Sequence, residues 1–81
     1  MKKTAVKAAR DIMEALGISQ KKLAVKMGLK SQQAAASMLY AKNGMRVDNF
    51  IKMMDVLGYE VVIRNRVSDE EITIIEKEDE N

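Results

Sequence analysis

Gln32 and Gln33 are the two residues in this sequence whose side chains are best suited to recognition chemistry. A glutamine amide donates and accepts hydrogen bonds, so it can make a two-bond contact with the edge of an adenine in the DNA major groove. Both follow Ser31, whose hydroxyl is suited to accept a bond from the amide of Gln33 or Ala34 and so begin a helix. Two glutamines alone do not distinguish this role from an ordinary exposed helix start. Their position after Gly28, on a basic chain, favours the functional interpretation.

Catalytic chemistry has little support in the same sequence. The chain has no cysteine and no histidine, which removes disulfides, thiolate metal sites and the commonest general base. Asp11 and Glu14 share one helix face, but Lys7 and Arg10 surround them, as on an ordinary solvated surface. No glycine-rich phosphate loop is present. We therefore predict that the protein is not an enzyme and has no metal site and no cofactor.

Two short helices around Gly28 are expected to position the glutamines. The first starts at Gln20, after Ser19 as its predicted cap, and has Leu23, Ala24 and Met27 on one narrow apolar face. Gly28 ends it, where a helix needs a residue that tolerates positive φ. The second, predicted over Gln32–Ala41, buries one face and leaves the other polar and uncharged. Helices this short bury little area alone, so each must pack on neighbours. The pattern predicts a helix-turn-helix. Its buried side is Ala35, Met38 and Leu39, and its predicted base contacts are Gln32, Gln33, Ala36 and Ser37.

These residues resemble a known family. Gln20, Ala24, Gly28, Ser31-Gln32-Gln33 and Asn43-Gly44 together are similar to the Cro/repressor-type (XRE-like) helix-turn-helix DNA-binding proteins, over about residues 4–58. The resemblance implies a mostly α, four-to-five-helix repressor-like domain. It also implies that Gln20 contacts a phosphate and that Gln32, Gln33 and Ser37 read bases.

The spacing departs from the family pattern at one place. The usual pattern has buried aliphatic residues six and nine positions after the turn glycine, where this chain has Ala34 and Ser37. A shift by one residue gives Ala35 and Met38, which are both apolar. We therefore predict that Leu29-Lys30 makes the turn one residue longer than usual. Without that extra residue, the base-facing set would shift by one.

The charge is divided unevenly along the chain. Residues 1–68 contain 13 Lys/Arg and 5 Asp/Glu, a net charge of +8, whereas residues 69–81 carry −6; the whole chain is +2. A basic body favours a polyanionic partner. Simple solvation remains the alternative for Lys42, Arg46 and some of the lysines. The predicted DNA phosphate contacts are Gln20, Lys21, Lys22, Lys30, Ser31, Lys42, Asn43 and Arg46.

Two further helices complete the predicted body. The first runs to Leu16, with Thr4 as its cap, Gly17 at its end and an apolar stripe that includes Leu16. The last covers Asn49–Leu57, capped by Asp48 and closed by Gly58.

The hydrophobic period changes after Gly58. Residues 59–66 alternate as a β-strand, residues 67–70 form a connection, and residues 71–75 make a weaker strand. An isolated hairpin is marginal in water, so it needs a partner, most naturally the same hairpin of a second subunit. The resemblance also implies dimerisation through such a C-terminal strand. The predicted dimerisation residues are Tyr59, Val61, Val62, Ile63, Ile72 and Ile74.

The sequence thus predicts a DNA-binding domain over residues 1–58, a dimerisation hairpin over 59–75 and a flexible acidic tail over 76–81. The expected function is that of a homodimeric regulator, by family default a repressor, on an inverted repeat in double-stranded DNA with reading helices about 34 Å apart. The alternative is an antitoxin or other module whose hairpin and tail hold a protein partner such as a toxin. Charged residues interrupt any signal peptide and no apolar run is long enough for a membrane span, so we expect a cytoplasmic protein with no membrane partner.

Overall fold

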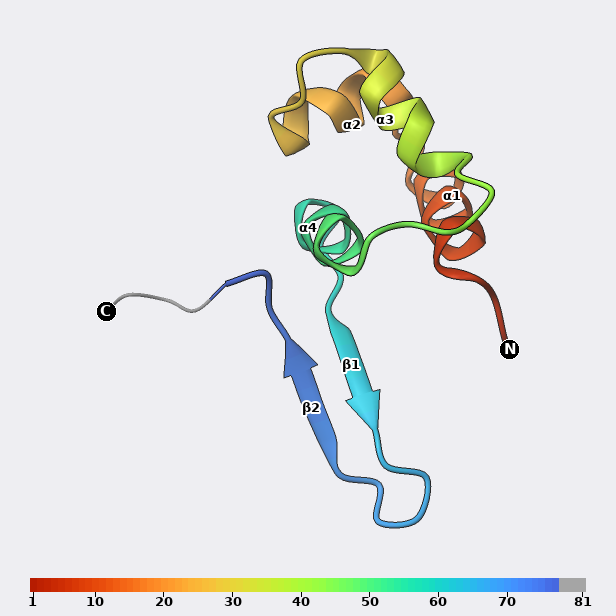
Figure 1. Ribbon diagram of the computed structural model, residues 1–81, viewed down its shortest axis with the longest axis vertical. Helices are drawn as coiled ribbons and strands as arrows, with labels where there is room; N and C mark the ends of the chain where they lie inside the picture. The colour runs from red at the N-terminus through yellow and green to blue at the C-terminus, as the bar shows by residue number, and fades with distance from the viewer. Residues whose placement is uncertain (78–81) are drawn as a thin grey trace.

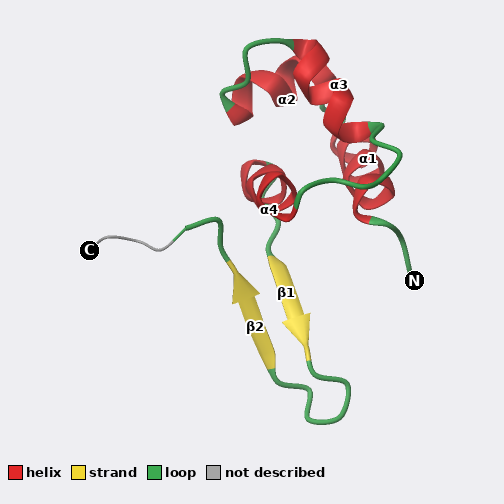
Figure 2. Ribbon diagram, in the orientation of Figure 1, coloured by secondary structure: helices red, strands yellow, loops and turns green. Residues whose placement is uncertain are grey.

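Four helices and one antiparallel β-hairpin follow one another along the chain in the computed structural model, which describes residues 1–77. Residues 78–81, most of the predicted acidic tail, lie outside the described residues. The helices form one body, and the hairpin extends from it along the longest axis of the molecule (Figures 1 and 2). About half of the chain is helical, in agreement with the predicted mostly α class. The elements are α1 (Ala5–Leu16), α2 (Gln20–Met27), α3 (Gln32–Leu39), α4 (Val47–Val56), β1 (Val61–Arg64) and β2 (Glu71–Ile74).

The predicted helix boundaries are confirmed for the first three helices at their N-termini. The hydroxyls of Thr4, Ser19 and Ser31 each accept a hydrogen bond from the backbone amide three residues on, at 3.1, 3.1 and 3.2 Å. Each bond satisfies an amide that has no partner within its helix. Gly17 and Gly28 end α1 and α2 in the left-handed conformation, with φ of 68° and 71°. The sequence therefore defines this part of the fold locally.

The predicted cap of α4 is wrong. The helix begins at Val47, its N-cap is Arg46, and no side chain makes a cap hydrogen bond. Asp48 lies in the first turn instead, where its carboxylate accepts from the Asn49 amide at 2.9 Å and from Arg46 at 3.0 Å. A negative charge also interacts favourably with the helix dipole there. The helix ends at Val56, and Gly58 follows with a φ of 86°.

The core lies where the four helices meet. α3 packs on α1 and α2, and α4 packs on the same two helices from another side. Leu23, Leu39 and Met53 are the largest side chains with essentially no exposed surface. Leu16, predicted to belong to the apolar stripe of α1, is instead 46% exposed at the end of that helix. No charged or polar residue of the described chain is buried as a whole, so the fully buried core consists of apolar residues.

The hairpin is shorter than predicted. Its register pairs Val61 with Ile74, Val62 with Thr73, Ile63 with Ile72 and Arg64 with Glu71. Tyr59 lies outside β1 because its amide donates to the Met54 carbonyl at 2.8 Å, which ties it to the end of α4. Asn65 closes the turn, since its side-chain oxygen accepts from the amides of Val67 and Ser68.

One face of the hairpin is entirely β-branched and apolar. Val61, Ile63, Ile72 and Ile74 share it because paired residues of an antiparallel ladder point the same way. Val61 and Ile74 are half-buried near α4, but Ile63 and Ile72 remain 57% and 63% exposed. Half of this apolar face is therefore uncovered.

Among residues 1–77, no helix has the length and apolar character needed to cross a bilayer.

Candidate nucleic-acid interface

The α2–turn–α3 unit, residues 20–39, contains the candidate site. Gly28 ends α2, and the Leu29 amide donates to the Ala24 carbonyl at 2.8 Å, which closes the helix end. Ser31 then begins α3 in an extended conformation. Gly28 has no atom within 4 Å of an added Cβ, so its role is conformational rather than steric. The turn is fixed at both ends by local hydrogen bonds.

The burial of α3 confirms the predicted longer turn. Ala35 has no exposed surface and Leu39 is 1% exposed, whereas Ala34 is only half-buried and Ser37 is exposed. Met38 is half-buried and packs against the core. The shifted register therefore places small and apolar residues inward and keeps the serine out of the core. The predicted C-terminal end of this helix is wrong, because Tyr40 is its C-cap and Ala41 lies beyond it.

The opposite face of α3 is polar and uncharged. Gln32, Gln33 and Ser37 are exposed and Ala36 is half-buried, so the four predicted base contacts share the outward side of the helix. The helix lies at the end of the molecule remote from the hairpin (Figure 1). Ser37 Oγ donates to the Gln33 carbonyl at 3.0 Å. Its hydrogen is thereby occupied, and its lone pairs remain available to accept a bond from a base amino group.

The predicted phosphate contacts are mostly exposed around α2 and α3. Lys21, Lys22, Lys30, Ser31, Lys42 and Asn43 are exposed, and Gln20 is half-buried. Ser31 Oγ accepts from the Ala34 amide, and its own hydrogen is free to donate to a phosphate oxygen. At the start of α2 the Lys22 amide is taken by the Ser19 hydroxyl, whereas the amides of Gln20 and Lys21 have no acceptor within the helix, and such amides can bind anions.

Arg46 differs from the other predicted phosphate contacts because it already has a partner. Its guanidinium lies 3.0 Å from the Asp48 carboxylate, and the two side chains are 79% and 49% exposed. A pair that exposed is weak and exchanges readily with solvent or with another anion. Arg46 would therefore have to exchange Asp48 for a phosphate, whereas Lys42 makes no ion pair among residues 1–77.

Arg10 is a charged residue near the site that the sequence analysis treated only as solvated surface. Its guanidinium lies 4.9 Å from the centroid of the Tyr40 ring, and its Nε is buried without an acceptor in the described chain. Together with Gln20 at the start of α2, these two residues line a hollow of about 390 Å³. Since Arg10 and Tyr40 are far apart in the sequence, no local spacing signals their contact.

Asp11 is held by two lysines at the N-terminal side of α1. Its carboxylate oxygens lie 2.7 Å from Lys3 Nζ and 2.8 Å from Lys7 Nζ. These hydrogen bonds lower the pKa of Asp11 from 3.8 to about 2. A carboxylate with that pKa is a very weak base at neutral pH, far from the value suited to general-base catalysis.

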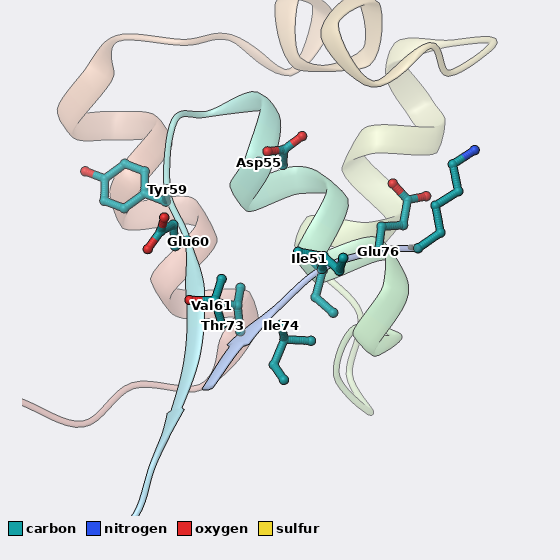
Figure 3. A pocket seen from close by; sticks show the side chains of 10 residues that line it. Ile51, Asp55, Tyr59, Glu60, Val61, Thr73, Ile74 and Glu76 are labelled. Atoms are coloured by element: carbon teal, nitrogen blue, oxygen red, sulfur yellow. The ribbon is translucent and has the colours of Figure 1, made fainter. Parts of the chain in front are cut away.

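A second hollow lies between α4 and the hairpin, away from α3. Its volume is about 370 Å³, and its apolar lining comes from Ile51, Val61 and Ile74. The acidic residues Asp55, Glu60 and Glu76 also line it, as Figure 3 shows.

Comparison of the chain with protein-family models, with curated proteins and with solved structures finds no match. The geometry and charge of these two regions are the features that bear on function.

Proposed function

We propose that this protein is a sequence-specific DNA-binding transcriptional regulator of the Cro/repressor type, a homodimer that acts as a repressor at an inverted repeat. The observation that supports this most is the division of α3 into two faces. One face is fixed in the core by Ala35 and Leu39, and the other presents Gln32 and Gln33 to solvent. A short helix held in this way is the element that helix-turn-helix proteins insert into the major groove.

In this proposal the exposed face of α3 reads bases. Gln32 and Gln33 each make a two-bond contact with the N6 and N7 edge of an adenine, worth about 1–3 kcal/mol of discrimination. Ser37 accepts a bond from a base amino group, because its hydrogen already bonds the Gln33 carbonyl. Ala36 is small enough for close approach and contacts a thymine methyl.

The basic side chains supply affinity rather than specificity. Lys21, Lys22, Lys30 and Lys42 are exposed and neutralise phosphates, releasing counterions from the DNA. Gln20, Ser31 and Asn43 add hydrogen bonds to the backbone, and these fix the register of α3 in the groove. Binding should consequently weaken steeply as salt is raised.

Dimerisation through the hairpin sets the form of the DNA site. Ile63 is exposed on the apolar face of the hairpin, and a second subunit placed beside it would remove part of its surface from water. A two-fold dimer carries two copies of α3, so its target is an inverted repeat with half-sites about one helical turn, 34 Å, apart.

Selection from a randomised duplex pool tests the proposal. The expected result is an enriched inverted repeat, and fluorescence anisotropy on it should show strong salt dependence. Gln33→Ala should relax the preference at one position of each half-site, whereas Lys22→Ala should weaken all sequences and lower the salt slope by about one per site.

Lys52→Ala is the matched control for these variants. Lys52 is a half-buried lysine on α4, outside the predicted contact set, so removing it should leave both sequence preference and salt slope unchanged. A pool that yields no preferred site at any salt concentration would refute sequence-specific recognition.

A second candidate function is protein binding at the hollow between α4 and the hairpin. Its apolar floor of Ile51, Val61 and Ile74 suits an apolar partner segment, such as one from a toxin held by an antitoxin. Its three carboxylates outnumber the one lysine in the lining, Lys77, and so favour a basic segment. Co-purification with the product of a neighbouring gene, lost when the exposed Asp55 of the hollow is changed in Asp55→Lys and kept in Gln33→Ala, would favour this function. Base reading and partner binding would use different elements, because the hollow is lined by α4 and the hairpin, whereas α3 lies remote from the hairpin (Figure 1).

A further inference from the structure

The strand β1 has an edge that no other strand of residues 1–77 covers. The sheet contains two strands in the order β1–β2, so each strand bonds its neighbour on one side only. The hairpin extends away from the helices, which leaves the outer side of β1 open along its length (Figures 1 and 2). Such an edge presents unpaired N–H and C=O groups to any strand of suitable sequence.

The hydrogen-bond alternation shows which residues present those groups. Asn65 and Glu70 are a bonded pair, since the Asn65 amide donates to the Glu70 carbonyl at 2.9 Å. Bonded and non-bonded pairs alternate along an antiparallel ladder, so every second residue before Asn65 is also in a bonded pair. The backbone N–H and C=O groups of Ile63 and Val61 therefore point to β2. The groups of Glu60, Val62 and Arg64 therefore point to the free edge.

The sequence along this edge is complementary to itself. It reads Glu60-Val61-Val62-Ile63-Arg64, an acid and a base on either side of three β-branched residues. When two copies are laid antiparallel about Val62, each Glu60 faces the partner's Arg64, and the two Val62 residues face each other. Each residue whose backbone N–H and C=O point to the free edge then faces a residue of the partner whose groups also point outward. This arrangement is required for hydrogen bonds between the two strands.

We propose that β1 pairs antiparallel with β1 of a second copy of this chain, in the register that centres on Val62. This inference rests on the homodimer of the proposed function and specifies how it is built. The product is a four-stranded sheet in the order β2–β1–β1–β2. Its apolar face contains Val61, Ile63, Ile72 and Ile74 from each subunit, and the exposed Ile63 of one lies beside the half-buried Val61 of the other.

The free edge of β2 is a poorer match to itself. Its outward-pointing residues are Glu71, Thr73 and Ile75, and pairing about Thr73 would put each Glu71 opposite an isoleucine. Pairing Glu71 with Lys77 would need an extended chain to residue 77. The strand instead ends at Ile74, and the chain bends at Glu76 and Lys77.

Two single-cysteine variants test which edge is used, and the natural chain has no cysteine to interfere. In the proposed register the two Val62 Cα atoms are about 5.5 Å apart, within the range for a disulfide. Val62→Cys should therefore give a covalent dimer in a buffer of oxidised and reduced glutathione, in which glutathione disulfide is the oxidant. Thr73→Cys is the matched control, because Thr73 is the cross-strand neighbour of Val62 and is also exposed. Its two copies would be about 14 Å apart, so it should remain uncrosslinked.

Charge reversal tests the register. Glu60→Arg places like charges opposite each other twice and should weaken the dimer about tenfold or more in sedimentation equilibrium. Adding Arg64→Glu to this variant restores opposite charges between the subunits. Adding Glu71→Arg as well keeps opposite charges at the pair of positions 64 and 71 within the hairpin. The triple variant should recover the wild-type dissociation constant.

These measurements contain no DNA, so their failure is distinct from failure of the proposed DNA-binding function. Crosslinking of Thr73→Cys in place of Val62→Cys would overturn the inference in favour of the β2 edge. A wild-type chain that sediments as a monomer, or a triple variant as weak as Glu60→Arg, would overturn it as well.

Discussion

The guanidinium of Arg10 lies 4.9 Å from the centroid of the Tyr40 ring, so a cation–π contact joins α1 to the C-cap of α3. Tyr40 is 60% exposed and still keeps this contact. Since α3 is only eight residues long, a second attachment beside its buried face helps to fix its direction on the body. The position of Gln32 and Gln33 thus depends partly on a pair of residues at the other end of their helix.

Tyr40→Leu should lower the free energy of unfolding by about 0.5–1 kcal/mol, because it removes the aromatic face and keeps an apolar side chain. Tyr40→Phe retains the ring and should remain close to wild type. Urea unfolding followed by circular dichroism measures both. Equal losses in the two variants would attribute the effect to the hydroxyl and exclude the ring.

Ala35→Leu should destabilise the fold by about 1–3 kcal/mol, because Ala35 is fully buried where α3 packs on α1 and α2. Ala34→Leu is the matched control, with the same chemical change one residue earlier at a half-buried position. In urea unfolding, Ala34→Leu should lower the free energy of unfolding by less than Ala35→Leu does. A larger loss in Ala34→Leu would show that the turn is one residue shorter and that the set of base-facing residues is shifted.

Gly28→Ala should destabilise by about 1–2 kcal/mol, through backbone strain alone. The φ of 71° is unfavourable for a residue with a Cβ, while nothing lies within 4 Å of that position. Gly28→Asn should cost less, because asparagine tolerates the left-handed region better. A Gly28→Ala variant as stable as wild type would mean that α2 ends differently.

The sequence analysis was most accurate where a structural feature depends on a few neighbouring residues. The caps at Thr4, Ser19 and Ser31 and the left-handed Gly17 and Gly28 follow from local chemistry, and all are confirmed. The longer turn also followed from local reasoning, since only the shifted register keeps Ser37 out of the core.

Errors arose where local preferences are compatible with two outcomes. Aspartate is favoured both as a helix cap and within the first helical turn, and Asp48 lies in the first turn. Tyr59 has high strand propensity, yet its amide completes the end of α4. The Arg10–Tyr40 contact joins distant parts of the chain and depends on tertiary packing, so no periodicity reports it.

The pairing of Asp11 with Lys3 and Lys7 gives a defined dependence of stability on pH. Because the folded-state pKa of about 2 lies below the ordinary 3.8, the ionised carboxylate stabilises the fold above the ordinary value. That contribution is lost as the pH falls from about 4 to about 2. The free energy of unfolding of wild type minus that of Asp11→Asn should thus be constant near neutral pH and shrink in this acidic window.

Carboxyl ¹³C chemical shifts measured through an NMR titration should place the midpoint of Asp11 near pH 2. High salt should move the Asp11 midpoint back toward 3.8, since both lysine pairs are partly exposed and salt screens them. A midpoint already near 3.8 at low salt would mean that neither lysine holds the carboxylate in solution.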